Sequence, residues 1–463
     1  MTELREQWNN QIGFLLAAIG SAVGLGNIWR FPYVAGTNGG GAFLIPYFFA
    51  ILTAGIPLLI LEYTIGKTYR GGAPVTLARM NKKFELLGWF QVMVAFVIST
   101  YYMAIIVWTV RYIGFSFNLA WGDDPSGFFM DFLGATESAT DLGQLQTNMI
   151  LAFLVVWAIV AFIMYKGIRK GIEIACRITL PILMLLIVIL VIRGATLPGA
   201  VDGLEFLFKP DWGALKDPSV WVAAYGQIFF SLSVGFAIMV SYSSYLPKKS
   251  DVVNSAFITA TANHGFEVFT AIGIFGIVGY MAGQQGAEVA EVASSGVGLA
   301  FITFPTAISS LPALNAVFGV CFFGALFIAA ITSMISILQA VISGIHDKFN
   351  VSHAKATTVV IVPAFLISIL FITGAGIIIL DIVDNFINNI GIVGCIEVIL
   401  LGWFFDLESL RREANRYSNF SIGRWWCYTL KFVTVAVLGV MIILNTVNYI
   451  QNGYGGYLLK DIV

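Results

Sequence analysis

Residues 20–30 read Gly20-Ser21-Ala22-Val23-Gly24-Leu25-Gly26-Asn27-Ile28-Trp29-Arg30, within an apolar run, residues 12–35, that is long enough to cross a bilayer. Three of these residues are glycines, which are poor helix formers. Asn27 and Arg30 follow at a depth where polar side chains are costly. The stretch predicts a helix broken in mid-membrane, whose freed carbonyl and N–H groups must be used by a ligand. The alternative is a glycine-rich face for helix–helix packing.

The composition places the rest of the chain in a lipid bilayer as well. The chain has 463 residues, of which 58% are hydrophobic and 11% are charged, and its mean hydropathy is +0.87. This balance indicates an all-α polytopic membrane protein. The net charge of −1 argues against nucleic acid as a partner. The polar N-terminus does not resemble a cleavable signal, and the cysteines and histidines lack the spacing of a disulfide framework or a metal site.

About eleven apolar spans form one predicted transmembrane domain over residues 1–463. The stretch 283–316 is too polar to span, but its apolar part, 297–311, predicts a re-entrant or capping hairpin. The expected spans are 12–35, 42–66, 87–118, 148–165, 171–192, 220–246, 254–282, 317–345, 356–374, 378–405 and 425–449.

Lys and Arg residues set the expected orientation, because cytoplasmic loops carry an excess of them. With the N-terminus inside, the outer segments hold only Arg193, Lys209, Lys216 and Lys460, and the cytoplasmic segments hold most of the others. Eleven spans then place the C-terminus outside the cell membrane.

A second interruption lies in span six, at Phe229-Phe230-Ser231-Leu232-Ser233-Val234-Gly235-Phe236. Ser233-Val234-Gly235-Phe236 echoes Ala22-Val23-Gly24-Leu25 at a distance of five spans, and an odd offset inverts the topology. Paired interrupted helices in two inverted halves point to a transport site at the midplane. We therefore expect inverted repeats over 12–192 and 220–405, with helices 1 and 6 broken and 425–449 as an extra helix 11.

The motif residues resemble a known family. Three stretches are similar to the first helix and following turn of the neurotransmitter:sodium symporters. They are Gly20 to Asn27, Trp29-Arg30-Phe31-Pro32 and Asn38-Gly39-Gly40-Gly41-Ala42-Phe43. The likeness is strongest to that family's bacterial transporters of leucine and other hydrophobic amino acids, and it covers spans one to ten. It implies a symporter that imports hydrophobic L-amino acids with sodium by alternating access. Many members have twelve spans, so the end of this chain departs from the pattern.

The resemblance implies two sodium sites built from hard oxygen ligands. The first would use the Ala22 carbonyl, Asn27, Ser231, Asn263 and the substrate carboxylate. The second would use the carbonyls of Gly20, Val23 and Ala329 with the hydroxyls of Thr332 and Ser333. The residues themselves leave alternatives open, since the asparagines could form an interhelical amide bond and the hydroxyls could bond to the preceding turn.

A substrate site is predicted where span one resumes. The N–H groups of Leu25 and Gly26 suit a carboxylate at a positive helix end. Gly24 stands where the family's amine transporters have an Asp, so an α-amino acid is favoured over an unpaired amine. The full predicted set is Ala22, Gly24, Leu25, Gly26, Ile98, Tyr102, Phe230, Ser231, Ser233, Phe236, Ser333 and Ile337, which is mostly apolar. Each apolar member alone is equally compatible with core packing.

Charge pairs match the family's gates, with Arg30 and Asp384 outside and Arg5 and Asp347 inside. Static surface pairing is the alternative for Arg5. Glu267 stands one turn after Asn263, where chloride-dependent members hold a small hydroxyl residue. With Tyr47, Gln227 and Ser231 around it, a fixed carboxylate there predicts transport without chloride, with Glu267 as the chloride substitute. The alternative is a buried Glu267 that stays protonated and is merely hydrogen-bonded.

Rival functions fit the sequence less well. A channel would need a continuous polar path, and an amino-acid sensor would need a signalling appendage. An enzyme would need a nucleophile set, a metal cluster or a phosphate loop, and none lies at a plausible depth, so we do not expect enzymatic activity. The preferred amino acid, the sodium stoichiometry and the oligomeric state stay open.

Overall fold

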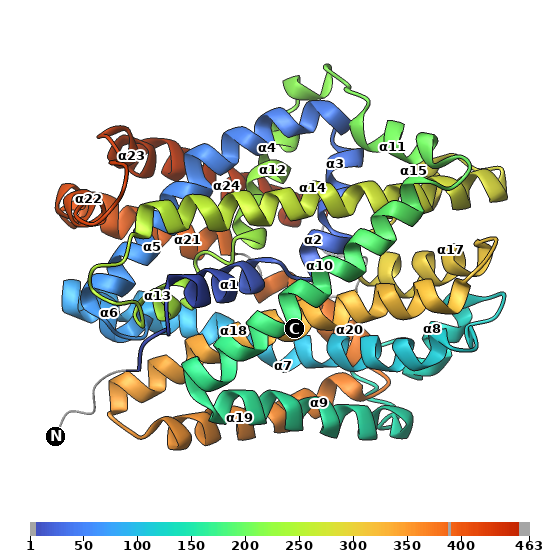
Figure 1. Cartoon of the computed structure of the whole chain (residues 1–463), viewed down its shortest axis with the longest axis horizontal. Helices are drawn as coiled ribbons and strands as arrows, with labels where there is room; N and C mark the ends of the chain where they lie inside the picture. The colour runs from blue at the N-terminus through green and yellow to red at the C-terminus, as the bar shows by residue number, and fades with distance from the viewer. Residues whose placement is uncertain (1–5, 388–389, 453–463) are drawn as a thin grey trace.

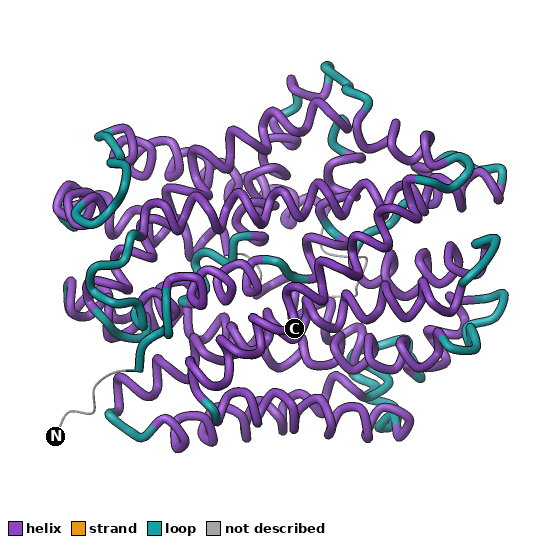
Figure 2. The backbone as a smooth tube through the Cα atoms, in the orientation of Figure 1, coloured by secondary structure: helices purple, strands orange, loops and turns teal. Residues whose placement is uncertain are grey.

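The computed structural model describes residues 6–387 and 390–452, and within them the chain is helical (Figure 2). The one β-type pairing there is an isolated antiparallel bridge between Leu145 and Thr373. The helices are α1 Gln11–Ala22, α2 Leu25–Trp29, α3 Phe31–Thr37, α4 Leu44–Ala50, α5 Ile56–Tyr69, α6 Ala73–Met80, α7 Glu85–Ser116, α8 Pro125–Leu133, α9 Thr147–Tyr165, α10 Glu173–Ala195, α11 Ala200–Phe208, α12 Pro218–Ser231, α13 Ile238–Ser243, α14 Val252–Gln285, α15 Val289–Val292, α16 Gly296–Gly298, α17 Phe304–Ser310, α18 Asn315–Phe349, α19 His353–Ser368, α20 Gly376–Ile387, α21 Ile390–Trp403, α22 Leu407–Asn415, α23 Trp425–Tyr428 and α24 Val435–Asn452.

The expected all-α membrane architecture is confirmed. Among the described residues, nine helices are long and apolar enough to cross a membrane, and the bent pair formed by α1 and Leu25–Thr37 makes a tenth span. The remaining expected span, span six at 220–246, is present as two short helices, α12 and α13. It falls below the length of a continuous span because the chain leaves the helix between Ser231 and Ile238.

Long helices surround both interrupted spans. In Figure 1, α14 crosses the upper half of the molecule, and α7 and α18 cross the lower half, with α1, α2 and α13 between them. The contacts agree, because α1 and α2 pack on α14 and α18, and α13 packs on α5 and α18. The interruptions therefore lie in the interior, where their freed backbone groups do not meet lipid.

The first break follows directly from the glycines. Helix α1 ends at Ala22, and the N–H of Val23 makes its last bond to the Ile19 carbonyl at 2.7 Å. Gly24 is extended, with φ −119° and ψ −166°, and the helix resumes at Leu25 after a bend of 53°. A carbonyl end and an N–H end thus meet at one point.

The second break has a less usual backbone. Gly235 has φ +82°, and Ser233 and Ala237 also adopt left-handed values, φ +53° and +64°. Left-handed backbone is costly for residues other than glycine, and it persists where surrounding contacts enforce it. One such contact is the buried side chain of Glu62 in α5, whose Oε1 accepts a hydrogen bond of 2.6 Å from the Gly235 N–H.

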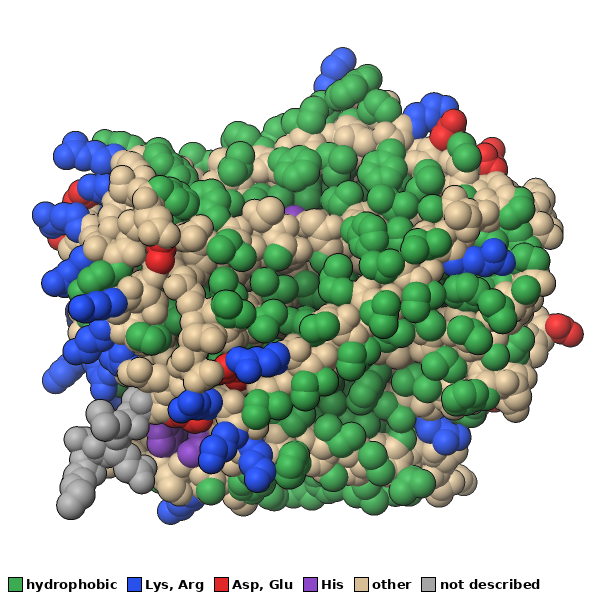
Figure 3. Space-filling model, viewed as in Figure 1, with side chains coloured by type: hydrophobic (Ala, Val, Ile, Leu, Met, Phe, Trp, Pro, Cys, Tyr) green, Lys and Arg blue, Asp and Glu red, His purple; other side chains and the backbone are tan. Residues whose placement is uncertain are grey.

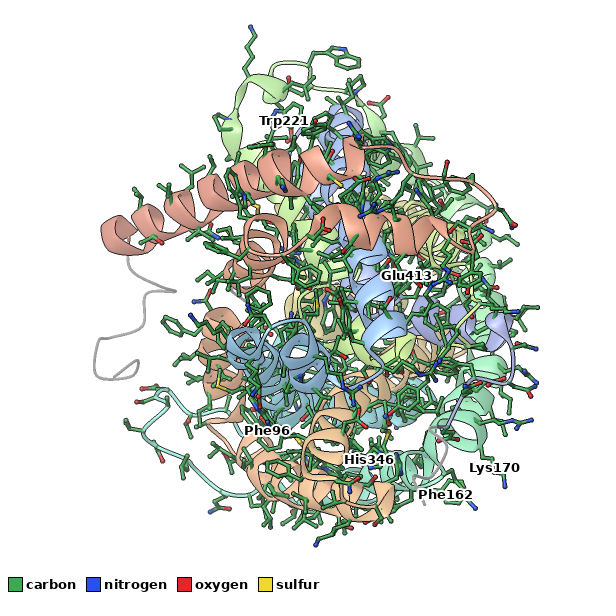
Figure 4. All side chains as sticks on the ribbon, turned by 90° about the vertical axis from the view of Figure 1, so that its left-hand side faces the viewer. Phe96, Phe162, Lys170, Trp221, His346 and Glu413 are labelled. Atoms are coloured by element: carbon green, nitrogen blue, oxygen red, sulfur yellow. The ribbon has the colours of Figure 1, made fainter. Side chains whose placement is uncertain are left out.

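The charged side chains are distributed unevenly. Figure 3 shows Lys and Arg gathered over the end of the molecule that carries the N-terminus, beside a broad surface of hydrophobic side chains. Figure 4 views the molecule from that end, where Lys170, His346 and Glu413 are labelled. The asymmetry is the one that the sequence predicts for the cytoplasmic side.

The apolar part of the loop 283–316 forms a helix over Gly296–Ser310. It packs on α14 and α18 through α17, and residues 295–298 border the central cavity described next. This position suits the capping element that the sequence predicts.

Candidate transport site

A cavity of ≈ 820 Å³ lies where the two breaks meet. It is bounded by the end of α1, the start of α2, the end of α12 and the unwound segment that follows, with α7 and α18 opposite. All residues of the predicted substrate site line it, namely Ala22, Gly24, Leu25, Gly26, Ile98, Tyr102, Phe230, Ser231, Ser233, Phe236, Ser333 and Ile337. The structure thus brings these residues together, and their roles stay a prediction.

The start of α2 offers backbone donors to this cavity. The first turn of a helix has N–H groups without intrahelical partners, here at Leu25 and Gly26. The Tyr102 hydroxyl interacts with the Ser333 side chain and the Leu25 backbone. A Cβ at Gly24 would stand 2.9 Å from the Ser333 Oγ, so a larger side chain there would intrude on the same space.

Gly26 is also constrained by packing. A Cβ at Gly26 would lie 2.4 Å from the Cε1 of Phe230, which is closer than carbon atoms approach. The Phe230 ring therefore sits directly against the backbone of α2, and the apolar wall of the cavity reaches the donor groups.

The residues of the first predicted sodium site form one buried network. The Asn27 Oδ1 accepts a hydrogen bond of 3.0 Å from the Gly24 N–H, and the Asn27 Nδ2 donates to the Asn263 Oδ1 at 2.8 Å. The Asn263 Nδ2 in turn donates to the Ser231 hydroxyl. Three helices, α2, α14 and α12, thus place oxygen atoms around the first break, beside Ala22. The interhelical amide bond that the sequence left open exists alongside this oxygen cluster.

The second predicted sodium site joins α1 to α18. The Ser333 hydroxyl donates to the Ser21 carbonyl at 3.4 Å, and the Thr332 hydroxyl donates to the Ala329 carbonyl at 3.0 Å. The Thr332 contact is the local bond to the preceding turn that was the alternative reading. Each hydroxyl oxygen keeps lone pairs that can coordinate a cation. The remaining members, Gly20 and Val23, lie at the end of α1.

The predicted outer-gate residues, Arg30 and Asp384, line the same cavity. The Arg30 Nη1 donates to the Gln227 Oε1 at 3.1 Å, and its guanidinium lies 5.2 Å from the centre of the Phe230 ring. The Asp384 Oδ1 accepts a hydrogen bond of 2.6 Å from the Tyr101 hydroxyl. Both gate residues therefore face the same space from α20 and from the end of α2.

Of the two residues of the predicted inner gate, Asp347 is among the described residues. Arg5 lies outside the described residues. The Asp347 Oδ2 accepts a hydrogen bond of 2.6 Å from the Gly72 N–H. Trp8 is buried, and its Nε1 donates a hydrogen bond of 2.8 Å to the carbonyl of Tyr242 in α13. This bond links the N-terminal segment to α13.

Glu267 is fully buried among polar side chains. Its Oε1 accepts a hydrogen bond of 2.8 Å from the Gln227 Nε2, and its Oε2 contacts the Tyr47 hydroxyl. Gln227 also accepts from Arg30, so the carboxylate is linked to the outer-gate arginine through one amide. Tyr47 and Gln227 are the partners that the sequence prediction named. Ser231, also named, bonds instead to Asn263.

Two residues at the site escaped the sequence analysis. One is Glu62, which holds the second break through Gly235. The other is His264, whose Nδ1 lies 3.1 Å from the Glu267 Oε2 and 2.6 Å from the Tyr47 hydroxyl. The spacing of His264 and Glu267, three residues apart on a helix, is a signal that the sequence does contain.

Comparison with known proteins gives consistent matches. A model of the sodium:neurotransmitter symporter family matches residues 5–126 and 123–461. An uncharacterized sodium-dependent transporter of Methanocaldococcus jannaschii is 43% identical over 456 residues, which cover 98% of this chain and 93% of the relative. The sodium-dependent dopamine transporter of Caenorhabditis elegans is 31% identical over 508 aligned positions, covering 98% of this chain and 82% of the relative.

Proposed function

Because the chain belongs to the sodium:neurotransmitter symporter family and is a sodium-dependent transporter of the membrane, we propose that it imports hydrophobic L-amino acids with sodium by alternating access. The observation that carries this proposal is the cavity between the two helix breaks. It combines backbone donors at Leu25 and Gly26 with apolar walls from Ile98, Phe236 and Ile337. An α-carboxylate fits the donors, and an apolar side chain fits the walls.

The proposal includes two sodium ions and the predicted membrane orientation. The oxygen clusters around Asn27 and around Thr332 would each hold one ion. The basic end of the molecule would face the cytoplasm across the cell membrane (Figure 3), with the C-terminus outside. The two halves, 12–192 and 220–405, would be the inverted repeats that rock against each other, with 425–449 outside them.

Uptake of labelled amino acids into proteoliposomes tests the proposal directly. We expect leucine-like substrates to accumulate when an inward sodium gradient is imposed, and not when potassium replaces sodium. Accumulation that is equal in both conditions would contradict sodium coupling. Comparing a series of side chains in the same assay would rank the preferred substrates.

The first prediction concerns the substrate's carboxylate. The named relative from C. elegans transports dopamine, an amine, so an amine substrate is the rival reading. At Gly24 there is no carboxylate to pair with an unaccompanied ammonium, and the carboxylates of the cavity, Asp381 and Asp384, lie in α20. We expect decarboxylated amines to compete at least about tenfold more weakly than their parent amino acids, since a lost charge-assisted bond costs about 1.5–3 kcal/mol. Equal competition by amines would show that the carboxylate is not the anchor.

The second prediction concerns the outer gate. Arg30→Ala and Asp384→Ala should each reduce transport more than they reduce sodium binding, because the pair closes access and does not coordinate the ion. A double-mutant cycle on uptake should show a coupling of about 0.5–3 kcal/mol. Asp381→Ala, one turn before Asp384 in α20, is the matched control and should couple less to Arg30. Strictly additive effects of Arg30 and Asp384 would mean that the two side chains never meet during transport.

A further inference from the structure

Three polar side chains from two helices, α4 and α14, meet at the Oε2 side of the Glu267 carboxylate. Glu267 and His264 come from α14, and Tyr47 comes from α4. The Tyr47 hydroxyl contacts the Glu267 Oε2, and the His264 Nδ1 lies 2.6 Å from that hydroxyl and 3.1 Å from Oε2. The two rings pack edge to face, with centroids 5.2 Å apart. On the other side of the carboxylate, Gln227 of α12 donates to Oε1.

The other nitrogen of His264 decides where the imidazole carries its proton. The Nε2 of His264 is buried and has no hydrogen-bond partner among the described residues. A ring proton is assigned to a nitrogen that has an acceptor within reach, and in His264 that nitrogen is Nδ1.

The contacts of Nδ1 require the same assignment. Its two neighbours are the oxygens of Tyr47 and Glu267. The Tyr47 hydroxyl donates its own proton to Glu267, so an unprotonated Nδ1 would face two oxygen lone pairs. With the proton on Nδ1, every short contact in the cluster has one donor and one acceptor.

We propose that His264, through a hydrogen bond donated by its Nδ1, is the positioning residue that fixes the Glu267 carboxyl group beside the first sodium site. Three donors, from His264, Tyr47 and Gln227, then converge on one carboxylate. This inference rests on the proposed role of Glu267 as the replacement for a mobile anion. It adds that the replacement needs a third donor that neither the sequence prediction nor the family match assigns.

The position of this cluster explains how it would affect sodium. Asn263, a predicted sodium ligand, precedes His264 directly, and Glu267 follows one turn later on the same helix. If Glu267 lost a donor, its carboxylate would rotate or shift toward other partners, and the negative charge nearest the ion would no longer be fixed. Mutation of a group that hydrogen-bonds to a metal ligand typically lowers metal affinity by about 10–100-fold.

Two amide substitutions test whether His264 acts as a hydrogen-bond donor at Nδ1 or only fills space. The side-chain amide of Asn reaches the position of Nδ1, whereas the longer Gln places its amide near Nε2. We expect His264→Asn to bind sodium about tenfold more tightly than His264→Gln or His264→Phe. Sodium binding would be measured calorimetrically on the purified full chain in gluconate buffer without substrate. The same substitutions at His353, whose Nε2 is also buried, are the matched control and should show no such ranking.

If His264→Gln or His264→Phe binds sodium as tightly as His264→Asn, the proposal is overturned. A second measurement uses the wild-type protein, so it does not depend on whether the variants fold. The chain has three histidines, so ¹⁵N spectra of histidine-labelled wild type are simple, and we expect the Nδ1 of His264 to carry a proton. An Nδ1 without a proton would overturn the proposal even if every variant were unstable.

The failure of this inference is distinguishable from the failure of the proposed function. Wild-type uptake that needs chloride would refute Glu267 as an anion replacement, whatever the tautomer of His264. Chloride-independent uptake combined with an unprotonated Nδ1 would refute the role of His264 alone.

Discussion

Replacing Asn27 or Asn263 by alanine should abolish sodium-coupled uptake. The Asn27 Oδ1 accepts a hydrogen bond from the Gly24 N–H at the start of α2, and the Asn27 Nδ2 donates to the Asn263 Oδ1. Each substitution removes a buried amide oxygen from the proposed first sodium site and leaves the other amide without its partner. We expect sodium affinity to fall at least about tenfold, by analogy with the loss of a partner at other metal sites, and uptake at ordinary sodium concentrations to disappear.

The measurement is sodium-driven uptake in proteoliposomes, together with sodium binding to the purified variants. Asn254→Ala is a matched control, because Asn254 lies in the first turn of the same helix, α14, and outside the hydrogen-bond network that joins Asn27, Asn263 and Ser231. Asn254→Ala should transport normally. Full sodium-dependent transport by both Asn27→Ala and Asn263→Ala would remove these residues from the sodium site.

The first helix break was predictable because its cause is local. Gly20, Gly24 and Gly26 weaken the helix by themselves, so the sequence alone predicts where the chain leaves the helix. The structure confirms the break within Val23 and Gly24. The helical character and most span positions follow equally from hydrophobic length.

The second break was predictable in place but not in form. Ser233 and Ala237 are not residues that favour left-handed backbone, and nothing in their own sequence predicts it. Their conformation depends on contacts from distant segments, such as the bond from the Gly235 N–H to Glu62, which lies far away in the sequence. For the same reason span six divides into α12 and α13.

The site residues also divide into those that the sequence predicts and those that only the structure reveals. Family resemblance assembled a substrate set that the structure gathers around one cavity. It did not reveal His264, because its importance comes from its contact with Tyr47 of α4, and a contact between distant segments is not visible in local patterns. The inner-gate pair is still a prediction, since Arg5 lies outside the described residues.

Glu267 should make transport independent of chloride, and Glu267→Ser should create a response to chloride. The carboxylate is fully buried and is held by Gln227 and Tyr47 one helical turn from Asn263. A buried carboxylate in a membrane helix is costly unless it has a function or is neutralised. Here its negative charge lies where it can offset the positive charge of a sodium ion held near Asn263.

The serine variant keeps a small polar side chain but removes the fixed charge, which leaves room for a mobile anion between Tyr47 and Gln227. We expect wild-type uptake to be the same in chloride and in gluconate, and uptake by Glu267→Ser to be several-fold higher in chloride than in gluconate. Glu288→Ser, a substitution of the exposed N-cap of α15, is the matched control and should behave as the wild type does. Wild-type uptake that stops when chloride is withdrawn would contradict this role, because the charge that Glu267 supplies would then be insufficient to hold sodium without a mobile anion.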